Sequence, residues 1–523
     1  MANHFVNQFA AQFSQHEHNK DTLKRLAQAM LNGDTCITLD ADEISAMQEQ
    51  SNLALAEQSQ PLVLDGQRLY TQRNWLYEQQ LAQALSAMSQ QPANELAVNL
   101  NSYFADEHQR QAAKLALTNQ LAIITGGPGT GKTTTVVKIL ALLLEQNPQL
   151  SIALCAPTGK AAMRLQESIA NGKQDQTNVA HLFDQQTLDI IPEQVSTIHR
   201  LLGSITKSVQ FRHHEDNPLS HDIIVVDEAS MIDLALMSKL VKALKSKAQL
   251  ILLGDKDQLA SVESGAVLAD CYEGLANNRV NLVNTYRFGG VIKDLAEAIN
   301  AKNAPMALDI IDQSTANTPD SLTWLDEQQC NPVDYAKRAY APYFKAVEAV
   351  TDKQGIGTLF DAFNQFQVLS PIRYLLAQFN NLKHSEATWY PGKPIMIAEN
   401  NRDLGLFNGD IGICMPDYDS AEQTLRIWFL QEGKLRSFAP ARLPKHELAY
   451  AITIHKSQGS EFKQVLMLIP DVLPEEGLFT KELVYTAITR AKQSVVISQK
   501  PALLAKMVET AVDRQSGLAD RLK

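Results

Sequence analysis

Eight consecutive residues have the composition of a phosphate-binding loop. The run Gly126-Gly127-Pro128-Gly129-Thr130-Gly131-Lys132-Thr133 fits the pattern G-x-x-x-x-G-K-[ST], between an apolar strand pattern and a helical one. In such a loop the glycines let backbone N–H groups surround phosphates, and the helix N-terminus adds its dipole. Lys132 would bridge the β- and γ-phosphates, and the Thr133 hydroxyl would bind Mg²⁺. The run, with the following Thr134, predicts a site for ATP and Mg²⁺.

Polar residues follow two later apolar strand patterns. IIVV at 223–226 ends in Asp227-Glu228, and LILLG at 250–254 leads to Gln258. We expect Asp227 to hold Mg²⁺ through water, and Glu228 to orient and deprotonate the attacking water. Gln258 is placed where a γ-phosphate is sensed. A plain polar turn is the alternative for Gln258, and two solvated carboxylates are the alternative for the acidic pair taken alone.

The sequence also predicts the strands and helices that would position these residues. Apolar, β-branched runs alternate with helical stretches at 121–125, 151–157, 222–228 and 250–255, and again at 365–371, 465–470 and 494–498. This alternation predicts two α/β domains with parallel sheets covered by helices. Turn signals and short strand patterns at 391–445 indicate a small β insertion. Residues 1–105 read as mainly helical, with one hairpin turning at Asp65-Gly66.

Composition limits the class of protein. The chain has 523 residues, 45% of them apolar, which is enough for two or three domains with buried cores. Its formal net charge of −11 argues against coating nucleic acid by bulk electrostatics, so phosphate binding must be local. The five cysteines form no C-x-x-C pair, and we find neither a leader nor a membrane-spanning run. A cytoplasmic protein is expected.

Further motifs distinguish among P-loop proteins. APTGKAA (156–162), TIHR (197–200), NTYR (284–287), IHKSQGSE (454–461) and YTAITRAK (485–492) have the order and spacing of superfamily 1 helicase motifs. GGPGTGKTTTV, VVDEASMIDL, GDKDQLASVESGAVL, LGLFNGDIGI and LVYTAITRAK resemble, more closely, the RecD family, the alpha subunits of the RecBCD helicase-nuclease. The resemblance covers residues 106–498.

That resemblance implies two tandem RecA-like domains, at 106–285 and 286–523, behind an N-terminal partner-docking domain at 1–105. It implies an ATP-dependent 5′→3′ DNA helicase that processes double-strand ends with RecB-like and RecC-like subunits. By the same resemblance, Arg287 and Arg490 contact the γ-phosphate and Gln109 reads adenine, with Gln111 close enough to confuse. The implied contacts to single-stranded DNA are Pro157, Thr158, Lys160, Thr197, His199, Arg200, Thr453, His455, Lys456 and Ser457.

Several alternatives stay open. The chain fits a free-standing RecD-like helicase less well, because its first 105 residues lack a helix-hairpin-helix glycine pattern, and a subunit with a silent ATPase is the other competing reading. His199 and His455 are individually compatible with hydrogen-bonded core histidines, and His213-His214 lacks nearby metal ligands. The acidic run Pro474-Glu475-Glu476-Gly477 reads as a solvated turn, so no nuclease site is expected. The segments after Cys271 and Arg373 are shorter than the family pattern.

Overall fold

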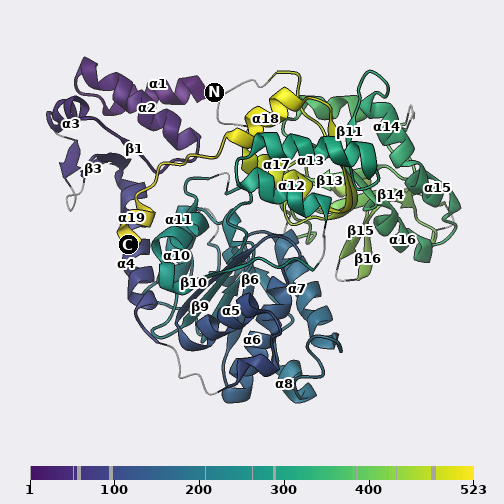
Figure 1. Cartoon of the computed structure of the whole chain (residues 1–523), viewed down its shortest axis with the longest axis horizontal. Coiled ribbons are helices and arrows are strands. Elements are labelled where there is room, and N and C mark those ends of the chain that lie inside the picture. Colours follow the sequence, from purple (N-terminus) through teal and green to yellow (C-terminus); the bar gives the residue numbers. More distant parts are fainter. Residues whose placement is uncertain are drawn as a thin grey trace.

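The computed structural model describes most of the chain. The described residues are 2–50, 52–55, 60–92, 98–205, 208–261, 263–286, 290–380, 382–383, 387–401, 403–420, 422–431, 433–472 and 479–523. Arg287 and the acidic run at 474–477 lie outside them. Figure 1 shows three parts, which are an N-terminal region, a first α/β domain below it and a second α/β domain beside both.

The first α/β domain is built on a six-stranded parallel sheet with the order β10-β5-β9-β8-β6-β7. Two hydrophobic clusters, one on each face, bury its strands under helices. Apolar residues on both faces explain why the strands read as continuous apolar runs. The strands are β5 (Leu121–Gly126), β6 (Ile152–Ala156), β7 (Val195–Thr197), β8 (Ile223–Val226), β9 (Gln249–Gly254) and β10 (Arg279–Leu282). The helices are α5 (Glu107–Thr118), α6 (Lys132–Gln146), α7 (Gly159–Gln174), α8 (Gln185–Ile190), α9 (Ile198–Leu201), α10 (Leu234–Lys242) and α11 (Val267–Gly274).

The second α/β domain repeats this design with a five-stranded parallel sheet of order β11-β20-β19-β12-β18. Its strands are β11 (Leu322–Leu325), β12 (Phe366–Ser370), β18 (Ala451–Thr453), β19 (Phe462–Met467) and β20 (Ala491–Ser498). Its helices are α12 (Val291–Asn300), α13 (Ala304–Asn317), α14 (Pro332–Ala339), α15 (Ala341–Ala349), α16 (Lys353–Phe363), α17 (Lys481–Ile488) and α18 (Pro501–Glu509). The shortened segment after Arg373 forms a single 3-10 helix, η5 (Tyr374–Phe379). The expected tandem α/β fold is confirmed.

The β insertion is an antiparallel sheet of five strands in the order β16-β15-β14-β13-β17. Its strands are β13 (Pro394–Ile397), β14 (Ile411–Pro416), β15 (Leu425–Gln431), β16 (Lys434–Phe438) and β17 (His446–Leu448). It has a small hydrophobic cluster of its own. A Cβ at Gly412 would lie 2.6 Å from side-chain atoms of Ile427 and Phe429, so a glycine is needed there for β14 to pack closely.

The N-terminal region is mainly helical, with α1 (Ala2–Phe13), α2 (Lys20–Leu31), α3 (Ala41–Gln48) and α4 (Gln72–Ser89). The expected hairpin is present as β3 (Leu62–Asp65) and β4 (Arg68–Thr71), and Gly66 has the positive φ of +60° that the turn requires. The strands β1 (Cys36–Thr38) and β2 (Leu53–Leu55) extend this hairpin to four strands. Three residues are too few to show alternation, so the sequence did not predict them.

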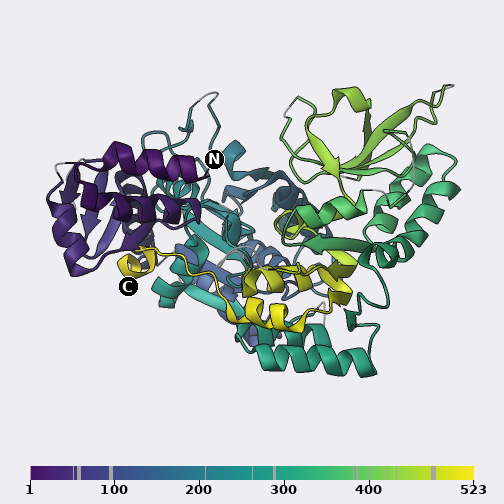
Figure 2. The same cartoon turned by 90° about the horizontal axis from the view of Figure 1, so that it is seen from above.

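The last residues cross the molecule. Residues 510–523 were counted with the second domain on sequence grounds, but they leave α18 and run back toward the N-terminal region (Figure 2). They end in α19 (Leu518–Leu522), where Leu518 and Leu522 are buried in a hydrophobic cluster of the first domain. We call residues 510–523 the C-terminal strap. Among the described residues, no helix combines the length and apolarity needed to cross a membrane.

Candidate active site and DNA track

The phosphate-binding loop connects β5 to α6 as expected. Gly129 and Gly131 have φ values of +78° and +81°, which only glycine adopts without strain. The Lys132 ammonium folds back over the loop, and its Nζ donates to the carbonyl oxygens of Gly126 at 2.6 Å and Gly127 at 3.0 Å. Gly131, the N-cap of α6, has no side chain to accept from the first helical N–H groups. The loop therefore presents donors that suit an anion.

Two carboxylates flank Lys132. Asp227 follows β8 and Asp255 follows β9, and because these strands are neighbours their carboxyl ends meet beside the loop. Burial and the charge of Glu228 raise the pKa of Asp227, and burial raises the pKa of Asp255. In both cases Lys132 acts in the opposite direction by favouring the charged carboxylate. Asp255 follows a buried strand just as Asp227 does, but no role was predicted for it from the sequence.

Glu228 has an unusual backbone. Its φ of 52° and ψ of 40° place it in the left-handed region, which non-glycine residues rarely occupy. Such a conformation costs on the order of 1–3 kcal/mol and persists only where the surroundings impose it. The strain coincides with the residue expected to orient water.

A residue of the second domain reaches the loop. The Tyr485 hydroxyl, on α17, donates to Asp255 Oδ2 at 3.0 Å and lies 2.9 Å from where a Cβ on Gly127 would stand. Gln258 Nε2 donates to the same carboxylate oxygen at 3.0 Å, so Gln258 is buried and turned toward Asp255. Tyr485 belongs to a quoted motif, but the sequence analysis assigned it no role.

The residue after Gln258 is anchored in the second domain. The Leu259 N–H donates to Thr486 Oγ1 at 3.1 Å, and Gln458 Nε2 donates to the Leu259 carbonyl oxygen at 3.0 Å. The Leu259 side chain joins the hydrophobic core of the second domain. Residues 255–259 therefore link the phosphate loop to the second domain directly.

The two glutamines considered for contact with adenine, Gln109 and Gln111, have different surroundings. A Cβ at Gly131 would lie 2.9 Å from Gln109 Nε2 and 3.7 Å from the Tyr286 ring. Gln111 instead donates to Glu107 at 3.0 Å on the exposed side of α5. The Tyr286 N–H donates to the Gly129 carbonyl oxygen at 2.8 Å, and the side chain is 65% exposed. The structure thus places Gln109 and an open aromatic ring beside the loop, and Tyr286, like Asp255 and Tyr485, had no role predicted from the sequence.

Arg490 is buried within the second domain. Its guanidinium donates to the carbonyl oxygens of Thr486 at 3.1 Å and Ser460 at 3.4 Å. Its charge acts on Lys160 and Tyr485, which places it near the boundary between the domains.

The residues expected to contact DNA form three groups. Pro157, Thr158 and Lys160 follow β6, while Thr197 ends the adjacent β7 and His199 and Arg200 follow it, so the structure brings these two groups together. In the third group, Thr453 ends β18 of the second domain, and His455, Lys456 and Ser457 follow it. The groups therefore occupy the carboxyl ends of parallel strands in both sheets.

Several of these side chains also support local structure. Thr158 Oγ1 and Thr197 Oγ1 accept from the N–H groups of Ala161 and Arg200 and cap α7 and α9. Ser457 is fully buried, and Lys456 pairs with Glu447. The most exposed polar members are His199, Arg200 and His455.

The insertion touches the first group. A Cβ at Gly159 would lie 2.8 Å from the Phe407 ring, and a Cβ at Gly409 would lie 3.5 Å from Lys160 Cδ. Desolvation and the like charge of Arg164 lower the pKa of Lys160 to about 7, partly offset by Asp410. The loop before β14 therefore covers part of the strand end that carries Lys160.

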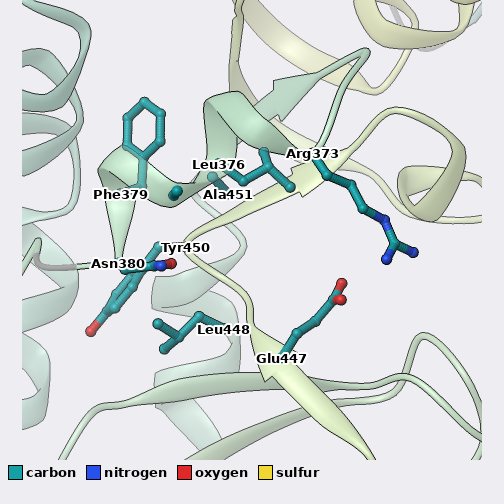
Figure 3. A pocket seen from close by; sticks show the side chains of 9 residues that line it. Arg373, Leu376, Phe379, Asn380, Glu447, Leu448, Tyr450 and Ala451 are labelled. Carbon is teal, nitrogen blue, oxygen red and sulfur yellow. The ribbon is translucent and has the colours of Figure 1, made fainter.

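A cavity of about 210 Å³ opens beside the third group. It lies between η5, β17 and the start of β18, and Figure 3 shows Arg373 and Glu447 pointing toward one another at its opening. Its walls include Leu376, Leu448 and Tyr450. Through the Glu447–Lys456 pair, this cavity adjoins the expected DNA track.

In the part of the chain that the structure describes, the side chains were compared with the ligand sets of metal sites. Within the described ranges, no group of three or more His, Cys, Asp and Glu residues is placed to hold a metal ion. In the pair His213-His214, the His213 ring meets the Asn217 carbonyl oxygen at 3.2 Å and His214 approaches Asp216 at 3.7 Å.

Comparisons with known proteins found two matching family models and similar solved structures. A family model described as an AAA domain matches residues 109–264, and one described as a UvrD-like helicase C-terminal domain matches residues 448–498. Among solved structures, a Bacteroides Pif1 helicase bound to single-stranded DNA aligns with a TM-score of 0.44 and 15% identity, over 76% of this chain and 94% of that one.

Curated relatives extend over nearly the whole chain. The RecBCD enzyme subunit RecD of Mycolicibacterium smegmatis is 37% identical over 88% of this chain and 83% of the relative, and that of Haemophilus influenzae is 33% identical over 88% and 81%. The ATP-dependent RecD2 DNA helicase of Deinococcus radiodurans is 29% identical over 74% of this chain and 48% of its own length. The extent and level of this identity establish that the chain belongs to the RecD family of RecBCD enzyme subunits.

Proposed function

We propose that this RecD-family chain, an ATP-dependent DNA helicase subunit, uses ATP hydrolysis between its two α/β domains to move 5′→3′ along single-stranded DNA. The observation that carries the proposal is the Tyr485 hydroxyl of the second domain beside Gly127 and Asp255 of the first. Tyr485 of the second domain thus contacts the phosphate loop of the first. Nucleotide turnover at that loop can therefore change the distance between the DNA-binding groups of the two domains.

The loop donors suit ATP, and each residue has a role in this proposal. Backbone N–H groups of residues 126–134 and the Lys132 ammonium hold the phosphates, while Thr133 and Asp227 hold Mg²⁺, which when bound neutralises charge on the phosphate oxygens. Glu228 takes the proton of the attacking water, and Gln258 responds to the γ-phosphate. Gln109 reads adenine, and Arg287 and Arg490 approach the γ-phosphate from the second domain.

The DNA strand lies across the carboxyl ends of β6, β7 and β18 in this proposal. Hydroxyl, imidazole and cationic donors there suit sugar and phosphate, which sequence-independent movement requires. The carboxyl ends of the strands in each sheet provide one DNA-binding group in each domain. The loop carrying Phe407 must shift for Lys160 to reach a phosphate.

We also propose the assembly that the names of the relatives indicate. The chain would act in the cytoplasm with RecB-like and RecC-like subunits on double-strand DNA ends. The pure chain should hydrolyse ATP without shortening labelled DNA, because cleavage is assigned to a partner.

Polarity is the sharpest test of this proposal. Duplexes of equal length with a 5′ single-stranded tail, a 3′ tail or no tail would be mixed with the chain, ATP and Mg²⁺, and strand separation would be followed. We expect separation of the 5′-tailed duplex alone. Separation of the 3′-tailed duplex alone would refute the polarity, and DNA binding without hydrolysis would favour the subunit with a silent ATPase.

A further inference from the structure

The C-terminal strap connects the second α/β domain to the first. It starts on the second domain, where the Lys481 N–H donates to the Thr510 carbonyl oxygen at 2.7 Å and the Val512 N–H donates to Glu482 at 3.0 Å. It ends in the first domain, where Leu518 is fully buried. Figure 2 shows its extended course between these attachments. The strap therefore spans the boundary between the two domains.

Arg514, midway along the strap, holds the loop that follows Gln258 and Leu259. Its Nη2 donates to the Ser261 carbonyl oxygen at 2.7 Å, and its Nη1 donates to those of Glu263 at 3.0 Å and Gly265 at 3.1 Å. Hydrogen bonds from an ionised guanidinium are stronger than neutral ones, and the fork geometry fixes their direction. One side chain thus gathers three carbonyl groups of a loop whose other end carries the residues at the phosphate site.

The N-terminal region meets the same point. Gly33 has a φ of +90°, and a Cβ there would lie 2.7 Å from Arg514 Cζ, so a larger residue would strain the backbone and displace the guanidinium. The Gly33 carbonyl oxygen accepts from the Gly265 N–H at 2.9 Å, and the Gln515 N–H donates to Asp34 at 2.8 Å. Arg514 is therefore shared by the strap, the N-terminal region and the loop.

We propose that Arg514 is a positioning residue that holds Ser261, Glu263 and Gly265 so that DNA bound by the second domain accelerates ATP hydrolysis at the site that includes Asp255 and Gln258. The inference rests on the proposed function. The structure places Arg514 on the loop, away from the phosphate donors, so its effect is on coupling. Without the guanidinium, three carbonyl groups lose their shared donor, and the anchored Leu259 no longer transmits a fixed position to Gln258.

The test uses the full chain with Arg514→Ala, Arg514→Lys and a control, Lys523→Ala. Lys523 lies on the same strap, where it forms exposed ion pairs with Glu273 and Asp520. For each variant, ATP hydrolysis would be measured with and without oligo-dT, giving kcat, the KM for ATP and the oligo-dT concentration for half-maximal stimulation, beside the Tm.

We expect Arg514→Ala to keep basal kcat and KM within about twofold of the parent while DNA stimulation falls at least about fivefold. Arg514→Lys should regain less than half of the stimulation, because an ammonium does not reproduce the guanidinium fork. Lys523→Ala should match the parent. If Arg514→Ala fails to fold, Arg514→Lys at parental Tm carries the test.

Parental stimulation in Arg514→Ala, or in Arg514→Lys where that variant stands alone, would overturn the inference. The inference would also be overturned if the variant lost basal hydrolysis and Tm in proportion to its loss of DNA stimulation, because a proportional loss is a purely structural effect. A parent chain without DNA-stimulated hydrolysis would overturn the proposed function, and this inference with it.

Discussion

The ionised side chain of Asp227 lowers the folding stability of the chain without nucleotide. In the chain without nucleotide its carboxylate is desolvated beside Glu228, and Lys132 compensates only in part, so its pKa is raised. A carboxyl with a raised folded-state pKa binds a proton more readily in the folded chain than in the unfolded one. Its contribution to stability therefore falls as pH rises through the interval from 3.8, the ordinary pKa, to the raised value. Above that interval the ionised group is a net cost.

Asp227→Asn is expected to stabilise the chain without nucleotide and to remove hydrolysis. At pH 8 the neutral amide avoids burying a second charge next to Glu228, a gain on the order of 1 kcal/mol in unfolding free energy. Mg²⁺-dependent ATP hydrolysis should be lost because an amide is a poor ligand. Thermal unfolding and ATPase assays would check both effects, and a gain that persists unchanged at pH 4 would contradict the electrostatic cause.

Substitution of Arg490 tests its predicted role as an arginine finger. Arg490→Ala should retain nucleotide binding within a few-fold but lose hydrolysis by about 10³-fold or more, the scale of an arginine finger. Arg490→Lys should recover little, because one ammonium does not replace the fork. Both variants also leave the carbonyl oxygens of Thr486 and Ser460 without this donor, so Tm should fall as well. Weakened ATP binding with near-normal turnover would make Arg490 a ground-state ligand instead.

At the scale of elements, the carboxyl ends of parallel strands collect both the ATP residues and the DNA residues. Helix starts follow the same strands, so a residue such as Thr158 caps α7 and also faces the expected DNA track. The two roles are separable because capping needs a side-chain acceptor, whereas binding a phosphate needs a donor and no negative charge.

Thr158→Asp is expected to keep the cap of α7 while repelling DNA. Tm should stay near that of the parent, because aspartate is as good an N-cap as threonine, and the Kd for oligo-dT should rise several-fold. Thr158→Ala should instead lower stability by about 1 kcal/mol through loss of the cap. Unchanged affinity in Thr158→Asp would remove Thr158 from the DNA track.

The strands and the phosphate loop were predictable because their signals are local. Buried parallel strands read as apolar runs, and the loop motif needs its glycines at fixed spacing, as Gly129 and Gly131 confirm. Asp255 had the same local signal as Asp227, the end of a buried strand, whereas Tyr485 and Arg514 were not predictable, because their roles arise from contacts between segments far apart in the chain. The three-residue strands β1 and β2 are formed by pairing with the hairpin and carry no pattern of their own.

At the scale of the whole molecule, an acidic chain must grip an acidic polymer through few donors. The formal charge is −11, and the exposed polar members of the expected track are His199, Arg200 and His455. A narrow grip of this kind differs from a basic surface in how it responds to salt, because counterion release scales with the number of phosphates neutralised.

The affinity for single-stranded DNA should therefore fall only slowly as the salt concentration rises. If about three or four phosphates are neutralised, log K for single-stranded DNA against log salt concentration should slope at about −2 to −3. Fluorescence anisotropy of labelled oligo-dT from 50 to 300 mM salt would measure it. A slope near −8 would indicate a broad basic surface and would contradict the narrow grip expected of a chain with a formal net charge of −11.

The central claim, that the loop around Lys132 hydrolyses ATP in response to DNA, is tested most directly by DNA-stimulated ATPase activity of Lys132→Gln. The matched control is Lys114→Gln, on the exposed face of α5. Lys132 donates to two loop carbonyl groups and adds little to core packing, so its variant should fold with parental circular dichroism. The account predicts stimulated hydrolysis in the parent and Lys114→Gln and none above background in Lys132→Gln. Near-parental hydrolysis by Lys132→Gln with oligo-dT present would contradict it.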